Sequence, residues 1–509
     1  MAEKHGAGLK ELSELDLGAE IVLVDWEEDD PENPLYWPLA KKYLNTAIPL
    51  YICGLTSMNG ASPGIMAHWG TTWFHTSRLG FATSGTAYLV SFAVASLVTA
   101  PLSELFGRKR IYQVATLLSA LLFLPQVFTH SLAVLIVVRC FRRSGAAGAA
   151  EAAEAAEATE AADKQQGAAA SAGNALIGGT IADLFPASSR SLPMNLFVLA
   201  NFIGQSAGGV VLGWVGEDIG IQWCYGVQGL ALAVGVGSTL LLSETRADVL
   251  LTRRARRLRR EGEEGVWGEG GKYVSRAELG EKHILEMIAL TTLEYLFTEP
   301  IVGALCIWIG FNWGTIYLGT ASTPLVFAQY TSSIGMQGTA QLTMLAGGIL
   351  GFASSWGQER LYRRACARSR TGQAKPEARL YFAVLGAFVF PAAMYAYAWT
   401  GRPHIHWIAP AIFCSVAMAG VSAINYLADA YETYSSSAQA SHGFVRSVFA
   451  GAFPLFARPM YEQLGYPVAS SVVASIALGL AAAPALLLVY GPALRRRSRV
   501  TSALTRDNF

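Results

Sequence analysis

A short charged turn at residues 100–112 holds the residues whose types and spacing point most directly to a molecular function. The turn reads A-P-L-S-E-L-F-G-R-K-R-I-Y and lies between two apolar runs. Gly107 permits a tight turn, while Ser103, Glu104, Arg108 and Lys109 put polar and charged groups of both signs at a helix junction. Such a cluster can pair across two halves of a protein in one conformation and separate in another, which would make it a gate. The alternative is that its cations only fix the side of a membrane on which the turn lies.

Ionisable residues within apolar runs are candidates for proton movement, because a charged side chain is costly in lipid. Arg139 lies inside one such run, and Glu299 lies one turn into another, next to Pro300. Glu299 could exchange a proton or only cap the start of its helix. Arg139 could instead be exposed by an interruption of its own helix. The first apolar run has no central Asp or Glu, so the sequence does not name a proton carrier.

Aromatic and amide side chains gather in residues 308–317, and this combination is typical of a pocket for amphipathic organic molecules or cations. The alternative is that the aromatic rings only pack inside the protein or face lipid. Further amides in other apolar runs are weaker candidates of the same kind. The candidates for the substrate cavity are Asn59, Asn201, Trp308, Asn312, Trp313, Tyr317 and Asn425.

The composition indicates a membrane protein. Apolar residues make up 52% of the 509 residues, charged residues make up 15%, and the mean hydropathy is +0.34. Soluble domains carry about 25% charged residues. The sequence contains no phosphate-binding glycine loop, nucleophile elbow or metal-ligand cluster, so we expect neither an enzyme nor a cofactor or metal site. The net charge of +1 gives no reason to expect a nucleic-acid partner.

Apolar runs near the roughly 20 residues needed to cross a bilayer recur along the chain and predict about twelve membrane helices. We expect an all-α fold of two six-helix bundles, residues 43–242 and 295–490. A cytoplasmic tail (1–42), a central cytoplasmic loop (243–294) and a second tail (491–509) complete the chain. The expected spans are 43–66, 79–103, 111–129, an interrupted fourth, 194–215, 223–242, 297–321, 339–356, 380–400, 405–427, 443–460 and 468–490.

Arginine and lysine residues recur in every second loop, which predicts that both termini lie in the cytoplasm. The alternative, a basic surface for nucleic acid, does not explain this regular placement. The basic clusters are found at residues 108–110, 253–260, 360–370 and 495–497.

The fourth span is interrupted. Residues 132–141 and 172–185 are apolar runs too short to cross a bilayer alone, and together they would make one normal span. Between them lies an Ala/Gly-rich segment, residues 142–171, in which glutamates recur every third residue from Glu151 to Glu160. We interpret it as an insertion into a once continuous helix, of the kind that a translated intron or a gene-model artefact produces. The alternative is a genuine elaboration, which inside a bilayer would need protein or water around it.

Several motifs together resemble the major facilitator superfamily, and within it the fungal drug:proton antiporter branch with twelve spans. The turn at residues 103–109 is similar to the family signature between spans two and three, with Ala100 in the place of its first glycine. The resemblance covers nearly the whole chain outside residues 142–171. The span-five motif has glycine at 208–209 where the family has a Gly-Pro pair, and Arg142 and Arg143 interrupt the family's span-four motif. Further matches are Trp26, Asp30, Asn33-Pro34 and Trp37, Glu244-Thr245-Arg246, Glu299-Pro300, residues 376–380, 425–431, Arg446 and Phe453-Pro454-Leu455-Phe456.

The resemblance implies a secondary transporter that exports small amphipathic solutes, with protons as the coupling ion and alternating access as the mechanism. It also implies that residues 103–109 form the cytoplasmic gate, with Asp183 as the partner of Arg108, and that Arg139 takes part in proton coupling. We expect a monomer in a lipid bilayer, in the plasma membrane or alternatively the vacuolar membrane. The open alternatives are a metabolite facilitator or importer of the same fold, and a sensor or scaffold without transport because span four is interrupted.

Overall fold

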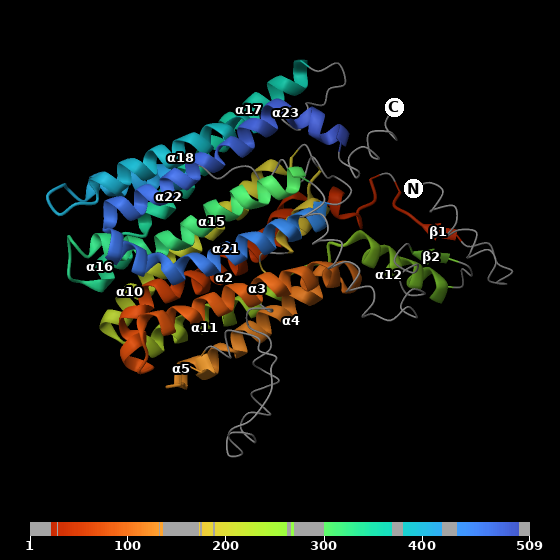
Figure 1. The fold of residues 1–509 in the computed structure, drawn as a ribbon. Helices are drawn as coiled ribbons and strands as arrows, with labels where there is room; N and C mark the ends of the chain where they lie inside the picture. Colours follow the sequence, from red (N-terminus) through yellow and green to blue (C-terminus); the bar gives the residue numbers. More distant parts are fainter. Residues whose placement is uncertain are drawn as a thin grey trace.

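The computed structural model describes residues 22–27, 29–131, 133–135, 173, 176–186, 189–261, 266–268, 300–368, 380–419 and 435–497. Its long helices run side by side in two groups, one drawn red to yellow-green and one drawn green to blue (Figure 1). Helices suit these apolar sequences because a backbone in lipid must satisfy its own hydrogen bonds. Arg139, Glu299, Asn425 and the segment 142–171 lie outside the described residues.

The N-terminal group covers residues 39–239 and follows a 3-10 turn, η1 (Pro34–Tyr36). Asn33 caps this turn, with its side chain accepting a hydrogen bond from the Leu35 amide at 3.0 Å. The group consists of α2 (Leu39–Trp73), α3 (Arg78–Phe106), α4 (Arg108–Leu121), α5 (Phe123–Phe128), α9 (Ile177–Leu184), α10 (Ser191–Asp218) and α11 (Ile221–Thr239).

The C-terminal group covers residues 300–497, and helix α12 (Ala247–Arg260) precedes it. The largest buried apolar cluster lies in this group and reaches into the other one through Tyr88, Leu89, Phe92 and Phe202. The group consists of α15 (Pro300–Phe327), α16 (Ile334–Thr339), α17 (Leu342–Arg368), α18 (Leu380–Thr400), α19 (Ile408–Met418), α21 (Ser435–Leu464), α22 (Tyr466–Leu480) and α23 (Ala482–Arg497).

The two groups meet along a few helix pairs. Helix α3 packs on α21, α2 on α15, and α10 on α16 and α17. Helix α16 lies at one end of the bundle and α12 lies beyond the other end (Figure 1). We refer to these below as the α16 end and the α12 end.

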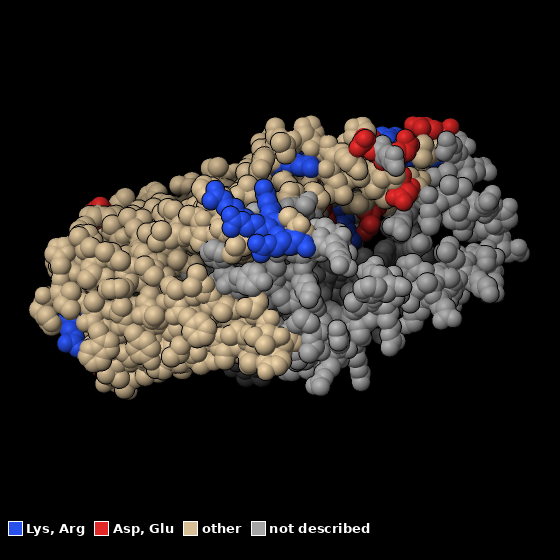
Figure 2. Space-filling model, turned by 90° about the horizontal axis from the view of Figure 1, so that it is seen from above, with Lys and Arg blue, Asp and Glu red and all other residues tan. Residues whose placement is uncertain are grey.

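The outer surface of the bundle suits a membrane. Figure 2 shows a face on which uncharged residues cover a long stretch, with basic and acidic side chains gathered away from it. Many large apolar side chains are exposed on the helices, among them Val94, Leu230 and Leu385. Among the described residues, four segments are long and apolar enough to cross a membrane: Arg78–Ser96, Arg108–Phe128, Leu192–Asp218 and Tyr466–Tyr490. The count of twelve spans stays a prediction.

The N-terminal tail is tied to the segment that connects the two groups. Strand β1 (Val22–Val24) pairs in parallel with β2 (Val266–Gly268), with Leu23 opposite Trp267. Carboxylates of the tail also pair with arginines of α12: Asp30 and Glu27 contact Arg254, the latter at 3.2 Å, and Glu32 lies 3.1 Å from Arg257. We call this set of contacts the tail clasp. No local pattern in the sequence predicts these contacts.

Asp30 is the buried member of the tail clasp, with 7% of its surface exposed. Its carboxylate accepts a hydrogen bond from the Glu32 amide at 2.8 Å. This hydrogen bond lowers the pKa of Asp30, and Arg254 lowers it further, although burial acts in the opposite direction. A carboxylate with a lowered pKa stabilises the folded state fully at pH values above its ordinary pKa of about 3.9. This contribution is lost as the pH falls through the pKa of the folded state. The tail clasp is therefore at full strength at neutral pH.

We expect Asp30→Ala to release the tail, because the change removes hydrogen bonds to a charged group worth about 1.5–3 kcal/mol. The measurement is the initial rate of limited proteolysis in the tail of the purified protein. Glu27→Ala is the matched control, because the Glu27 side chain is 81% exposed and its ion pair contributes little. Equal cleavage rates in the two variants would show that Asp30 does not hold the tail.

Candidate functional site

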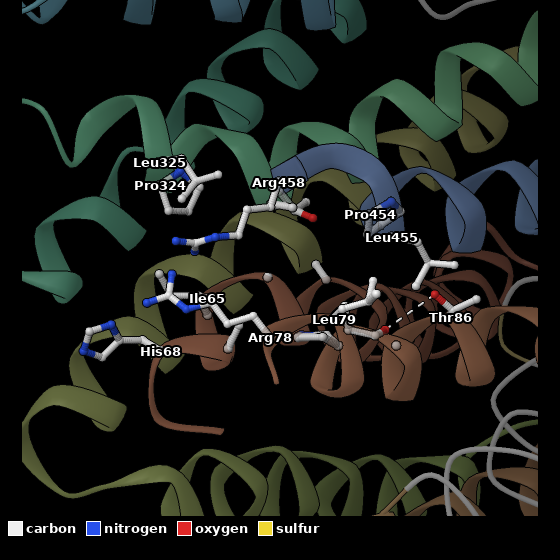
Figure 3. Close-up of a pocket in the computed structure, with 18 of the residues that line it drawn as sticks. Ile65, His68, Arg78, Leu79, Thr86, Pro324, Leu325, Pro454, Leu455 and Arg458 are labelled. Carbon is white, nitrogen blue, oxygen red and sulfur yellow. Dashed lines mark hydrogen bonds between the residues drawn. The ribbon is translucent and has the colours of Figure 1, made fainter. Parts of the chain in front are cut away.

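A large cavity lies between the two groups of helices and extends toward the α16 end. It has a volume of about 670 Å³ and is lined by α2 and α3 on one side and by α15 and α21 on the other. We call it the vestibule. In the close-up, Ile65 and Leu79 lie on one wall and Pro324 and Leu325 lie across the space from them (Figure 3).

Basic side chains line the part of the vestibule nearest the α16 end. Arg78 and His68 approach it from one wall and Arg458 approaches from the other (Figure 3). Arg458 is paired with Glu462 at 2.5 Å, one turn further along α21. The vestibule therefore combines apolar walls with polar and charged groups, as sites for amphipathic organic molecules do.

The vestibule is bounded by close contacts between the two groups of helices. A Cβ atom at Gly60 would lie 3.0 Å from the Tyr317 hydroxyl, and one at Gly64 would lie 2.8 Å from the Thr320 carbonyl oxygen. On the neighbouring pair of helices, the Thr86 hydroxyl donates to the Gly451 carbonyl at 2.8 Å. Small residues of this kind allow membrane helices to approach closely.

A second, smaller cavity lies deeper between the two groups, and Leu89 lines both cavities. We call it the central pocket; its volume is about 20 Å³, enough for a single water molecule. Three of the predicted cavity residues line it: Asn201 from α10, and Trp313 and Tyr317 from α15. The Asn201 side chain accepts a hydrogen bond from Ser57 at 2.6 Å and donates one to the Phe197 carbonyl at 2.8 Å.

Three other predicted cavity residues, all within the described part of the chain, line neither cavity. Asn59, Trp308 and Asn312 are buried, with 3%, 3% and 6% of their surfaces exposed, but line neither the vestibule nor the central pocket. Sequence reasoning missed one residue of the central pocket that carries a charge. This residue is Arg446 of α21, and its signal was an arginine within an expected span, which appeared above only as a motif match.

At the α12 end, the structure brings Arg108 together with Asp183. Arg108 Nε lies 2.5 Å from Asp183 Oδ2, and Nη1 donates to the Ser103 hydroxyl at 3.2 Å. Arg108 is 5% exposed, and its guanidinium lies against Gly179, where a Cβ atom would be 2.4 Å from Nη2. All these partners belong to the N-terminal group, whereas a gate was expected to pair charges between the two groups. The gating role stays a prediction.

Glu244 holds the start of α4. It is 4% exposed, and its carboxylate accepts hydrogen bonds from the amides of Arg108 at 2.9 Å and Lys109 at 3.3 Å. An anion is favoured at this position because the first amides of a helix have no partners inside it. Glu104 was the expected anion of this turn, and Glu244 was only a motif match; the side chain of Glu104 lies outside the described residues.

Glycines join α10 to α16 near the α16 end. A Cβ atom at Gly338 would lie 2.2 Å from the Gly209 carbonyl oxygen, and Gly213 lies close to Gly335. Glu217 caps α16, since its carboxylate accepts hydrogen bonds from the Gly335 amide at 2.6 Å and from the Ser333 hydroxyl at 2.9 Å. This contact, which we call the α10–α16 contact, uses the glycine that replaces the expected proline.

We expect Gly338→Ala to separate α10 from α16, because the added methyl group would meet a backbone oxygen that cannot move aside cheaply. Overpacking of this kind costs about 1–3 kcal/mol. The measurement is the melting temperature of the purified protein together with its transport rate, and both should fall. Gly479→Ala is the control, because nothing lies within 4 Å of a Cβ atom at that glycine. Unchanged values for Gly338→Ala would refute the close contact.

Comparisons with known proteins agree on the family. A family model described as Major Facilitator Superfamily matches residues 165–454. The efflux pump radE of Floropilus chiversii is 31% identical over 492 residues, which cover 94% of this chain and 85% of that protein. The major facilitator superfamily multidrug transporter mdrA of Aspergillus fumigatus is 30% identical over 489 residues, which cover 93% of this chain and 75% of that protein.

Solved structures agree on the fold. The xylose transporter XylE from E. coli, in a partially occluded inward open conformation, matches with a TM-score of 0.55 and 11% identity. The match covers 89% of this chain and 98% of that chain. The all-α major facilitator fold expected from the sequence is thereby confirmed. The chain belongs to the major facilitator superfamily and is a multi-pass membrane transporter, not an enzyme.

Proposed function

We propose that the protein exports small amphipathic organic solutes, by alternating access and in exchange for protons. The observation that carries this proposal is the vestibule, which lies between the two groups of helices and has apolar walls and a basic rim. The names of the relatives radE and mdrA, an efflux pump and a multidrug transporter, support the same direction and the same kind of solute. The xylose relative is described as a proton symporter, which supports protons as the coupling ion.

The proposed cycle uses the contacts described above. The two groups would rock about the α10–α16 contact, while Arg108 at the α12 end would exchange its partners within the N-terminal group for charged groups of the other group. Arg139 and Glu299 remain the proposed proton-coupling residues. We propose further that the protein acts as a monomer in the plasma membrane and takes no nucleic-acid partner.

Transport assays test the proposal. Cells that express the full chain should retain less of a fluorescent amphipathic dye than cells with an empty vector. In proteoliposomes, an imposed proton gradient should drive the dye against its concentration gradient. Movement of solute that ignores the proton gradient would favour a facilitator or importer, and no movement of any tested solute would favour a sensor or scaffold.

A further inference from the structure

Arg446 is a buried cation at the junction of the two groups of helices. It is 8% exposed, and its guanidinium lies over the indole ring of Trp313, with 4.8 Å between the guanidinium carbon and the ring centroid. Stacking on an aromatic ring stabilises a cation, but it compensates only part of the cost of removing the charge from water. Arg446 therefore needs an anion.

The described residues do not supply that anion. Every aspartate or glutamate side chain that the structure describes lies in the tail or toward one end of the bundle, away from the central pocket. They are Asp25, Glu27, Asp29, Asp30 and Glu32 in the tail, Asp183, Glu244, Asp248 and Glu261 toward the α12 end, and Glu217, Asp218 and Glu462 toward the α16 end.

A second hydrogen-bond donor of the central pocket is also unused within the described part of the chain. Trp313 is 2% exposed, and its Nε1 atom is buried without a hydrogen-bond partner there. A buried donor without an acceptor costs about 1–3 kcal/mol, so most are paired in folded proteins. Arg446 and Trp313 line the same pocket, so one bound acceptor group can satisfy both.

The surroundings of these two donors fit an apolar molecule that carries one anionic group. Tyr88, Phe92 and Tyr317 supply aromatic walls, and the vestibule beyond Leu89 offers about 670 Å³. The guanidinium of arginine presents a planar fork that matches the two oxygens of a carboxylate. The central pocket holds only about 20 Å³, so this conformation keeps the anion site closed.

We infer that Arg446, with Trp313, binds the anionic group of the transported solute, and that the solute is an amphipathic organic carboxylate. This inference rests on the proposed export function and narrows it to one class of substrate. It predicts that a molecule loses most of its affinity when its carboxylate is replaced by a neutral group of the same shape.

The test uses the purified full-length protein and a matched pair of probes, 2-naphthoate and 2-naphthamide. We expect 2-naphthoate to bind at least about 30-fold more tightly than the amide, because losing one partner of a buried charge pair has an effect of this size. In Arg446→Met the preference should disappear, while the weak binding of the amide remains. Equal affinities of the two probes for the unmodified protein would overturn the inference, as would a preference that survives Arg446→Met.

Thermal stability gives a readout that needs no ligand. Methionine keeps the apolar stem of Arg446 and removes a charge that no described carboxylate compensates, so ligand-free Arg446→Met should melt at or above the temperature of the unmodified protein. A melting temperature several degrees lower would mean that Arg446 serves the fold, and would overturn the inference. Arg402→Met is the control, because Arg402 also lies over an indole ring, that of Trp399 at 4.9 Å, but lines neither cavity.

Failure of this inference can be separated from failure of the proposed function. Export of a neutral dye by the unmodified protein, without any preference for 2-naphthoate, would leave the export function standing and overturn the anion site. If the unmodified protein exports no tested solute but still prefers 2-naphthoate to 2-naphthamide, the anion site is supported and the export function is contradicted.

Discussion

Replacing Gly107 with alanine is expected to abolish transport. The glycine has φ +91° and ψ 150°, a conformation essentially reserved for glycine that costs other residues about 1–3 kcal/mol. A Cβ atom there would also lie 2.3 Å from Glu244 Oε2. The carboxylate would have to move, and the first amides of α4 would lose their acceptor. Transport per molecule in the membrane, measured with a fluorescent dye, should fall at least tenfold.

Gly220 offers a control that separates backbone strain from the contact with Glu244. It also has a positive φ, +105°, but nothing lies within 4 Å of a Cβ atom at this position. Gly220→Ala should therefore lower membrane abundance at most, and leave transport per molecule within about twofold of the unmodified protein. Equal loss of transport in both variants would trace the effect to strain alone, and full activity of Gly107→Ala would contradict the prediction.

Arg108→Ala should abolish transport while the protein still reaches the membrane in normal amounts. Breaking a buried ion pair by removing one partner costs about 3–5 kcal/mol, and here the cost falls on the conformation in which Arg108 contacts Asp183. A loss of this size shifts the balance between two conformations by roughly two to four powers of ten. The measurements are dye efflux and the amount of protein in the membrane fraction.

Arg108→Lys decides between a gate and a topology signal. Lysine and arginine are equally effective in setting the orientation of membrane helices. Lysine has a single ammonium group, however, and cannot contact Asp183 and Ser103 at once as Arg108 does through Nε and Nη1. We expect Arg108→Lys to lose most of its transport and Arg110→Ala, at an exposed position of the same turn, to keep it. Full activity of Arg108→Lys would leave Arg108 with a role in orientation only.

The sequence predicted the fold well because the apolar runs and the motifs of the family point to the same answer. It also predicted the contact between Arg108 and Asp183, through the resemblance. It could not tell which face of an almost uniformly apolar helix meets a neighbour, because hydropathy is nearly the same on every side. For this reason Asn59 and Trp308 were proposed as cavity residues, although they line neither cavity.

The residues that the sequence analysis missed depend on contacts between distant parts of the chain. Glu244 reaches the start of α4 across more than 130 residues, and Asp30 reaches Arg254 across more than 220. No local pattern encodes such pairs. Arg446 was noticed only as part of a motif, and its separation from every acidic side chain that the structure describes became visible only when α15 and α21 were placed together.

The contact between Gly209 and Gly338 divides α10 into two arms of unequal length. Gly209 lies nine residues from the C-terminal end of α10 and eighteen from its start, so the two arms are roughly 14 and 27 Å long. A rigid helix that tilts about this point moves its long arm twice as far as its short arm, and in the opposite direction. A small movement of the short arm beside α16 would then be accompanied by a movement about twice as large at the start of α10. The glycine pair is the pivot of both movements.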